Sequence, residues 1–330
     1  MNLTTKYLGL TLQNPLVIGA SPYCDTAYVA RQLQDAGAAA IVMRSLFEEQ
    51  IIAEQRALVH HLESSADSSA EASSYFPAFS EYQLTPDHYL KQLEHLKKTL
   101  SIPVIGSLNG SRPGGWTEYA KRIADAGADA LELNLYQLVT DPTQKAAQIE
   151  AGMVETVRSV TSTVKIPVAV KISSFHTSLA NFVLELEGAG ASGVVLFNRF
   201  YQPDFNLEDL EVLPQLKLSD NSELLLRLRW LAIVSPHVKG SLSASGGVHS
   251  PEDAVKAVLA GAHTVQIVSA LLKHGPRFIT TLLNGMEHWL TEHGYESVEQ
   301  LCGAMNHRRC PDPSAFERAN YIRILQSWRV

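Results

Sequence analysis

The chain has 330 residues, of which 45% are hydrophobic and 18% are charged, so it can form one large domain or two ordinary ones with a sizeable core. A formal net charge of −7 implies no basic face, which argues against nucleic acid or an anionic membrane as a partner. The first residues lack the pattern of a signal peptide, and no apolar run reaches the roughly 18 residues of a membrane span. Cys24, Cys302 and Cys310 show no metal-ligand spacing, so we expect a cytoplasmic protein with reduced thiols.

Four similar segments recur along the chain, and in each a helix ends near a glycine that is followed by a β-rich apolar run. They are 35–43 (DAGAAAIVM), 125–133 (DAGADALEL), 188–196 (GAGASGVVL) and 259–267 (LAGAHTVQI). The glycine suits the left-handed position that often follows a helix, and the short link then leads into a buried strand.

A second series of apolar strands alternates with the first, over 14–21, 102–109, 166–173 and 240–247. Helical patterns lie between the strands, for example over 85–100, 114–127 and 250–262. Eight strands that alternate with helices predict an α/β fold, a single (β/α)8 TIM barrel over residues 1–330. An open doubly wound sheet is the alternative, but the first strand continues as GASPYCD and not as the GxGxxG fingerprint of that fold.

Two segments interrupt the barrel pattern, and a third comes after it. Residues 60–80 come after strand two and residues 201–221 after strand six. Both leave the C-terminal ends of strands, where such barrels carry their active sites, so we interpret them as lids or subunit contacts. Residues 297–330 are predicted to be a C-terminal extension with a further helix.

Polar residues at the C-terminal ends of the predicted strands should meet at one end of a barrel. In chain order they are Ala20-Ser21, Arg44-Ser45, Asn109, Asn134 and Tyr136, Lys171 and Ser173, Asn198 and Arg199, Ser245-Gly246-Gly247 and Ser269. Lys171, inside VAVKIS, either faces the barrel interior or extends outward past the helices. Arg44 has the same two interpretations.

The segment SASGGVHSPEDA (243–254) has the features of a phosphate-binding loop. Gly246 and Gly247 end strand seven, Ser250 is a good N-cap for the next helix, and Asp253 lies near that helix start. Exposed amides of such a loop, together with a helix N-terminus, can bind phosphate. A tight turn that requires glycine is the alternative interpretation.

From about residue 2 to residue 296 the chain resembles the class 1 dihydroorotate dehydrogenases, which are FMN-containing (β/α)8 barrels. The resemblance rests on NLTTKYLGLTLQNPLVIGAS, ALELNL, VAVKIS, VVLFN and above all SASGGVHSPEDAVKAVLAGAHTVQIVSALL. The last segment is common to several flavin barrels, whereas the N-terminal segment and the Asn and Lys strands point to this family. The resemblance implies FMN as the cofactor, a small-molecule substrate and a homodimer.

The resemblance also implies roles for individual residues. Gly246, Gly247 and Ser269 match groups that hold the FMN phosphate, and Lys171 matches a lysine at the N1–O2 edge of the flavin. The full set matched to the cofactor is Ala20, Ser21, Arg44, Ser45, Asn134, Lys171, Asn198, Ser245, Gly246, Gly247, Val268 and Ser269. The set matched to catalysis is Lys171, Asn134, Tyr136 and Gln137.

The substrate half of the predicted site departs from the family. Gln137 stands in place of the cysteine base, and a carboxamide has no useful proton affinity for that role. Val139 replaces an asparagine, Ser73 and Ser74 stand where another is expected, and Arg44 replaces a lysine. A substitute base would have to be Tyr136, Cys24 or His176, and each of these is also consistent with a purely structural role.

Three functions are consistent with these observations. The first is an FMN oxidoreductase that transfers hydride from a CH–CH bond of a small polar substrate, with dihydroorotate as the best single candidate. The second is a flavin-binding subunit without dehydrogenase turnover, which the loss of the base favours. The third is a flavin-free phosphate-binding lyase or isomerase in which Lys171 forms a Schiff base.

Overall fold

The computed structural model describes residues 1–47, 85–110, 116–135, 137–199, 202–213 and 217–327. Eight parallel strands form a closed barrel, because β4, at one end of the hydrogen-bonded order, also pairs with β6 near the other end. The short β5 (Leu46–Phe47) comes after β6 in that order and pairs with it alone. The barrel strands are β3 (Leu16–Ile18), β4 (Ala40–Val42), β6 (Val104–Gly110), β7 (Ala130–Leu135), β8 (Val168–Ile172), β9 (Gly193–Leu196), β12 (Ser241–Ser245) and β13 (Thr264–Ile267). The predicted TIM barrel is therefore confirmed.

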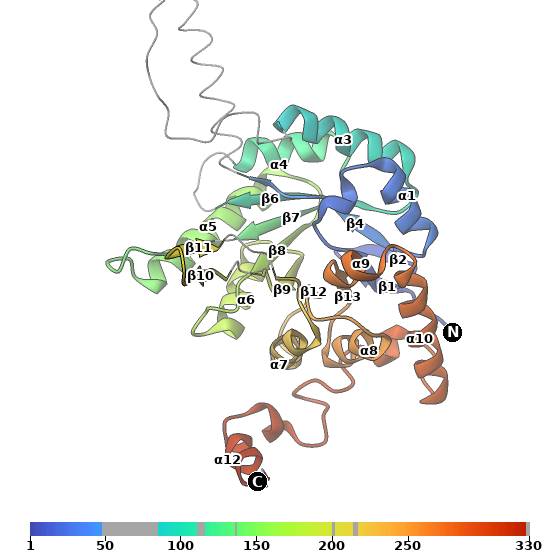
Figure 1. Cartoon of the computed structure of the whole chain (residues 1–330), viewed down its shortest axis with the longest axis vertical. Coiled ribbons are helices and arrows are strands. Elements are labelled where there is room, and N and C mark those ends of the chain that lie inside the picture. Colours follow the sequence, from blue (N-terminus) through green and yellow to red (C-terminus); the bar gives the residue numbers. More distant parts are fainter. Residues whose placement is uncertain (48–84, 111–115, 136, 200–201, 214–216, 328–330) are drawn as a thin grey trace, which may run out of the picture.

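Helices cover the outside of the barrel between successive strands (Figure 1). They are α1 (Ala27–Asp35), α3 (Pro86–Thr99), α4 (Trp116–Asp125), α5 (Ala146–Thr163), α6 (Leu179–Gly188), α7 (Leu224–Val234), α8 (Pro251–Ala260), α9 (Ser269–His274) and α10 (Phe278–Glu292). The glycines after α1, α4, α6 and α8 have φ values between 94° and 120°, which confirms the left-handed position that the repeated segments predict.

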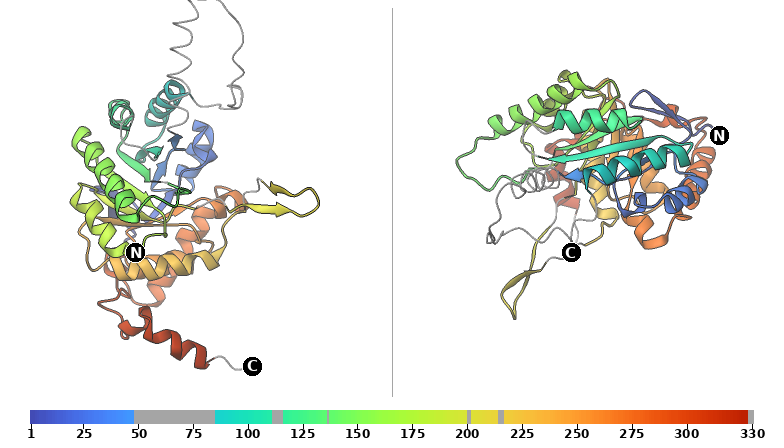
Figure 2. Two further views of the ribbon diagram at one scale, coloured as in Figure 1. Left: turned by 90° about the vertical axis from the view of Figure 1, so that its left-hand side faces the viewer. Right: turned by 90° about the horizontal axis from the view of Figure 1, so that it is seen from above.

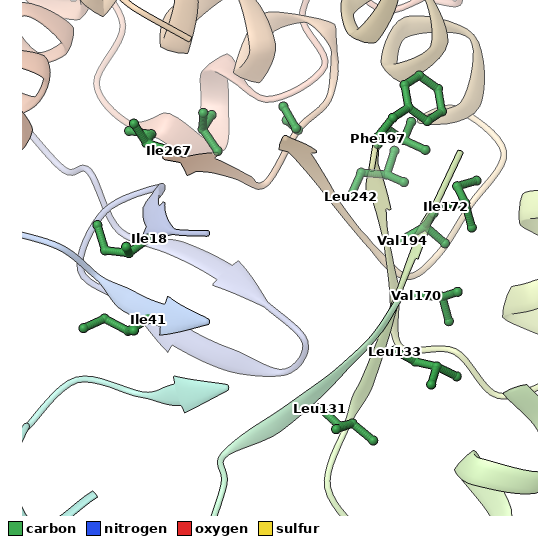
Figure 3. Packing of buried hydrophobic residues seen from close by; sticks show 14 of the residues in the cluster. Ile18, Ile41, Leu131, Leu133, Val170, Ile172, Val194, Phe197, Leu242 and Ile267 are labelled. Carbon is green, nitrogen blue, oxygen red and sulfur yellow. The ribbon is translucent and has the colours of Figure 1, made fainter. Parts of the chain in front are cut away.

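The core has two parts, separated by the barrel wall. Outward-facing strand residues such as Ile18, Leu133 and Val170 pack against the helices, and Figure 3 shows these and their neighbours on successive strands. Inside the barrel a smaller cluster of mostly small residues, including Ala40, Ala130 and Ala169, fills the N-terminal half. Alternating side chains of each strand therefore supply both cores, as the pleat requires.

An N-terminal hairpin of β1 (Thr5–Tyr7) and β2 (Leu10–Leu12) covers the N-terminal end of the barrel. Its Tyr7, Leu8 and Leu12 belong to the interior cluster, and the Leu8 amide donates to the Ser241 hydroxyl at 3.0 Å. This end of the barrel is closed by apolar packing, so polar chemistry inside the barrel belongs to the opposite end.

A hairpin of β10 (Asp204–Asn206) and β11 (Glu211–Leu213) lies within the predicted insertion after strand six and extends away from the barrel (Figure 2). The other predicted insertion, 60–80, lies outside the described residues. The C-terminal extension contains α11 (Val298–Leu301), the 3₁₀ turn η4 (Pro313–Phe316) and α12 (Ala319–Ser327). In the described part of the chain, no helix has the length and apolar character needed to cross a membrane.

Candidate functional site at the C-terminal end of the barrel

The residues predicted from the sequence meet at one end of the barrel because all eight strands run parallel. Ser21 follows β3, Arg44 follows β4, Asn198 follows β9 and Ser269 follows β13, while Asn134 and Lys171 lie within β7 and β8 near their ends. Ser21, Asn134, Lys171 and Gly247 are buried; Ala20, Arg44, Ser45, Gln137, Asn198, Ser245, Gly246, Val268 and Ser269 are half-buried. Tyr136 lies outside the described residues.

Lys171 faces the barrel interior and forms the centre of a buried polar network. Its Nζ lies 3.3 Å from Glu132 Oε1 and donates to Gln266 Oε1 at 3.0 Å. Gln266 closes the triangle by donating from Nε2 to Glu132 Oε2. The lysine and glutamate side chains are only 9% and 1% exposed, so each charge depends on the other for compensation. The outward-pointing interpretation of Lys171 is therefore wrong.

The same network is unfavourable for Schiff-base chemistry. A lysine nucleophile must present a neutral amine to its substrate. The Lys171 Nζ is instead engaged by the Glu132 carboxylate at 3.3 Å and by a second acceptor, Gln266 Oε1, at 3.0 Å. This arrangement favours a fixed positive charge over a nucleophile.

Two carboxamides lie beside Lys171 in the same layer of the barrel. Strand register pairs Asn109 with Asn134 and Asn134 with Lys171. Asn134 Oδ1 is buried without a hydrogen-bond partner among the described residues, and so is the Ser21 hydroxyl at the end of β3. Because an unsatisfied buried polar group is costly, these two atoms indicate a ligand that supplies the missing partners.

The loop after β12 combines left-handed backbone with a helix start. Gly246 and Gly247 have φ values of 92° and 85°, and a Cβ at Gly247 would lie 2.4 Å from the Leu224 amide nitrogen. Ser250 caps α8 by accepting from the Asp253 amide at 3.2 Å, as the sequence predicts. Both glycines are therefore required by the backbone, and their amides lie beside a helix N-terminus.

A buried arginine stands behind this loop. Arg227 of α7 donates from Nε to the Ser245 carbonyl at 2.7 Å, and a Cβ at Gly246 would lie 2.9 Å from its Nη2. Burial lowers the pKa of Arg227 from its ordinary value, and the neighbouring Glu223 opposes that shift. Glu223 lies 3.5 Å from Arg227 and 3.3 Å from Arg199, so one carboxylate serves two cations. The loop therefore has two arginines near it that share one carboxylate.

Arg44 does not stand alone at the end of β4. Its Nη2 forms an ion pair with Asp25 Oδ2, and the two side chains are 41% and 33% exposed. The neighbouring Ser45 hydroxyl lies 2.7 Å from the Ser107 hydroxyl. Arg44 Nε and Asp25 Oδ1 are buried without partners among the described residues.

The two described candidates for the base are poorly suited to the role. Cys24 is buried and donates to the Val42 carbonyl at 3.1 Å, and burial raises the pKa of its thiol far above the ordinary value. His176 stacks on Phe182 of α6, and its Nδ1 lies 2.9 Å from Glu150 of α5. Its ring is therefore anchored to the helical layer rather than to the barrel interior.

Sequence reasoning did not assign the side chains that pair with the cations of the site. Glu132 and Gln266 were visible as polar residues within apolar strands, but only the closed barrel brings them to Lys171. Asp25 lies in a loop and gave no signal. No group of three or more His, Cys, Asp or Glu side chains in the described ranges could hold a metal ion.

One cavity of about 500 Å³ lies at the other end of the barrel, beside residues 8–10 and 164–168. Lys165 is the single ionisable residue of its lining. This cavity therefore lacks the converging polar groups of a catalytic site, and such groups converge instead at the strand C-termini.

Comparison with known proteins agrees with this geometry. The family model described as dihydroorotate dehydrogenase matches residues 82–290. An Aeropyrum pernix protein with the provisional name dihydroorotate dehydrogenase A (fumarate) is 30% identical over 64% of this chain and 71% of its own length. The catalytic subunit of dihydroorotate dehydrogenase B (NAD(+)) from Thermoplasma volcanium is 24% identical over 92% and 98%.

The Escherichia coli NAD-dependent dihydropyrimidine dehydrogenase subunit PreA is also similar, with 21% identity over 94% of this chain and 78% of its own length. The family model covers well over half of the chain, and it includes β6 to β13 and thus most of the site. The chain therefore belongs to the dihydroorotate dehydrogenase family, a family of flavin-containing oxidoreductases.

Proposed function

We propose that this protein is an FMN-dependent oxidoreductase that takes a hydride from a CH–CH bond of a small polar substrate. The observation that carries the proposal is the buried Lys171 network beside Asn134, at the end of the barrel that also holds the Gly246-Gly247 loop. FMN, when bound, supplies a flavin ring that accepts the hydride. The substrate's CH–CH bond becomes a double bond, and its second hydrogen leaves as a proton.

The residues at this end of the barrel are chemically suited to FMN. Gly246 and Gly247 present backbone amides where a side chain would clash, and the Ser269 hydroxyl can donate to phosphate. The unpartnered Ser21 hydroxyl and Asn134 Oδ1 offer hydrogen-bonding capacity near the ring position. Lys171 would hold a fixed positive charge next to the negative charge that a reduced flavin develops.

The remaining matched residues would complete the cofactor site. Ala20 and Val268 would border the flat ring, and Arg44, Ser45, Asn198 and Ser245 would surround it from β4, β9 and β12. Gln137 lies two residues beyond β7 and would face the substrate. These assignments are proposals that rest on the family resemblance and on the strand positions.

The first experiment is to purify the protein and record its visible spectrum, and to identify any released cofactor by mass spectrometry. We expect a yellow protein with about one FMN per chain. Lys171→Met should lower the flavin reduction potential or weaken FMN binding, because the fixed charge is lost. Lys165→Met, three residues before the start of the same strand, is the control and should change neither. Colourless protein that takes up no FMN would refute the proposed function.

Dihydroorotate is the first substrate to test, and we expect it to reduce the flavin slowly near neutral pH. A positioned base commonly contributes about 10²–10⁴-fold to such a reaction, and Gln137 cannot act as one. Gln137→Cys should therefore raise the rate of flavin reduction. Rapid reduction by the unaltered protein would show that a different residue is the base, with Tyr136 the first to substitute.

A flavin-binding subunit without dehydrogenase turnover is the second candidate, and Gln137 is the observation that favours it. Such a protein would hold FMN and exchange electrons with a partner, but no CH–CH donor would reduce its flavin. Anaerobic reduction by a panel of cyclic donors distinguishes the two functions. We also propose a cytoplasmic location, which the free thiols of Cys24, Cys302 and Cys310 support.

We propose a homodimer in which the β10–β11 hairpin of one copy contacts α12 of a second. The hairpin pairs Phe205 with Val212, and its exposed apolar side chains, which are 56–87% exposed, are Phe205, Leu207, Leu210 and Val212. Its charged residues are all acidic: Asp204, Glu208, Asp209 and Glu211. The exposed apolar residues of α12 are Tyr321, Ile322, Ile324 and Leu325. Arg318, just before α12, adds positive charge, whereas Arg323 is already paired with Asp312. Both surfaces therefore expose apolar side chains, and Arg318 can pair with an acidic residue of the hairpin.

Sedimentation velocity tests the dimer directly. Phe205→Ser combined with Val212→Ser should dissociate it, because both changes remove apolar area from one face of the hairpin. Tyr28→Ser, on the exposed surface of α1, is the control and should leave the dimer intact. A monomeric unaltered protein would refute this contact.

A further inference from the structure

Three cationic side chains stand at or just beyond the C-terminal ends of β4, β8 and β9, and each has a carboxylate partner. Arg44 pairs with Asp25, Lys171 with Glu132 and Arg199 with Glu223. Recognition of an anionic group depends on positive charge that is not already compensated. Among the described residues, Arg44 and Lys171 on the β4–β8 side are therefore each compensated, whereas the β9–β12 side has Arg227 in addition.

The Arg44–Asp25 pair has one unused donor and one unused acceptor. Arg44 Nε and Asp25 Oδ1 are buried and without a hydrogen-bond partner among the described residues, although both side chains are partly exposed. A partly exposed side chain can turn to present such an atom without disturbing the core. A ligand that offers a carbonyl oxygen and an N–H group side by side would satisfy both atoms.

The neighbouring strands offer groups of the same kind. Asn109 and Asn134 occupy one layer of the barrel, and a carboxamide provides a donor and an acceptor without net charge. Asn134 Oδ1 also needs a donor. All of these unmet hydrogen bonds match the N–H and C=O groups of a cyclic amide, and none of them requires a carboxylate on the ligand.

We propose that the substrate is an uncharged cyclic amide, and that Asp25 determines this specificity by compensating the charge of Arg44. The inference rests on the proposed function and names the substrate class of the same site. A carboxylate on the ligand would meet an arginine that is already neutralised, and it would lie near the acidic Asp25. An uncharged ring would use Arg44 Nε and Asp25 Oδ1 together.

Uracil and orotate provide a direct test, because they differ only in the carboxylate. FMN-loaded protein is titrated with each ligand by calorimetry, and the two dissociation constants are compared. We expect uracil to bind more tightly than orotate. Asp25→Asn should improve orotate binding by up to about fivefold relative to uracil, since a partly exposed charge pair is worth only about 1 kcal/mol or less. Asp87→Asn, which breaks a similar ion pair with Arg122 on the outer helices, should leave the ratio unchanged.

The outcomes separate this inference from the proposed function. Orotate binding as tightly as uracil to the unaltered protein would overturn the inference, and so would an Asp25→Asn variant with an unchanged ratio. A protein that holds FMN but binds neither ligand would also overturn it while leaving the flavin assignment intact. The ratio for the unaltered protein decides the matter even where the Asp25→Asn variant does not fold.

Discussion

The buried Lys171–Glu132 pair makes a strong prediction about stability. Glu132→Gln preserves the size of the side chain and removes the charge that Lys171 needs. Unit charges 3.3 Å apart attract each other by about 5 kcal/mol at an effective dielectric constant of about 20. Desolvation of both groups in the folded state offsets much of this attraction, but the substitution removes the attraction while Lys171 stays buried.

The loss has a known order of magnitude. Breaking a buried pair typically costs about 3–5 kcal/mol. We therefore expect Glu132→Gln to lower the free energy of unfolding by about 3–4 kcal/mol. Glu155→Gln, which breaks an exposed pair with Arg158 on α5, should change it by less than about 1 kcal/mol.

Urea unfolding at pH 7 measures these changes, and a double-mutant cycle isolates the pair. Because Lys171→Met removes the buried cation, Glu132→Gln should cost far less in the Lys171→Met background than in the unaltered protein. The two losses would then be strongly non-additive. Additive losses, or a Glu132→Gln loss below about 1 kcal/mol, would show that the two charges do not depend on each other.

Three further predictions concern the cofactor loop, the substrate and the thiol. Gly246→Ala should weaken FMN binding and lower stability more than Gly127→Ala: the two glycines have a similar φ (92° and 94°), but only a Cβ at Gly246 would contact a neighbour, Arg227 at 2.9 Å. FMN titration and thermal unfolding of both variants test this. Burial raises the pKa of Asp25, and as the pH falls through that pKa its carboxylate becomes neutral and leaves the charge of Arg44 uncompensated. Calorimetry across acidic pH should therefore show orotate affinity rising relative to uracil affinity in the unaltered protein, but not in Asp25→Asn. Cys24 should resist thiol reagents in the native protein and react only after unfolding, because burial raises the pKa of its thiol; fast labelling of native protein would contradict this.

Periodic features made the barrel predictable from the sequence. Strand, helix, glycine and strand recur at similar intervals, and each feature has a local physical cause. Gly127 at the end of α4 shows this, because its φ of 94° is a conformation that other residues rarely adopt. The β10–β11 hairpin was not predicted as a hairpin, because its strands pair only with each other and lie outside the barrel repeat.

The site was predictable in part, for a related reason. Parallel strands bring their C-terminal ends together, so Asn134, Lys171 and Gly246 could be assigned to one site from their positions along strands. Partners across the barrel could not be assigned. Lys171 and Gln266 are 95 residues apart in the sequence, and only closure of the barrel brings them into hydrogen-bonding distance. Asp25 lies in a loop, where neither periodicity nor spacing predicts the direction of a side chain.

The charges of the site are distributed unevenly, and this asymmetry orients its ligands. On the side of β12, Arg199 and Arg227 share the single carboxylate of Glu223, so one positive charge of these three groups is uncompensated near the glycine loop. On the side of β4, Asp25 compensates Arg44, and Gln137 is neutral where the family has an ionisable cysteine. An anionic phosphate is therefore attracted to one side, and an uncharged ring is better tolerated on the other.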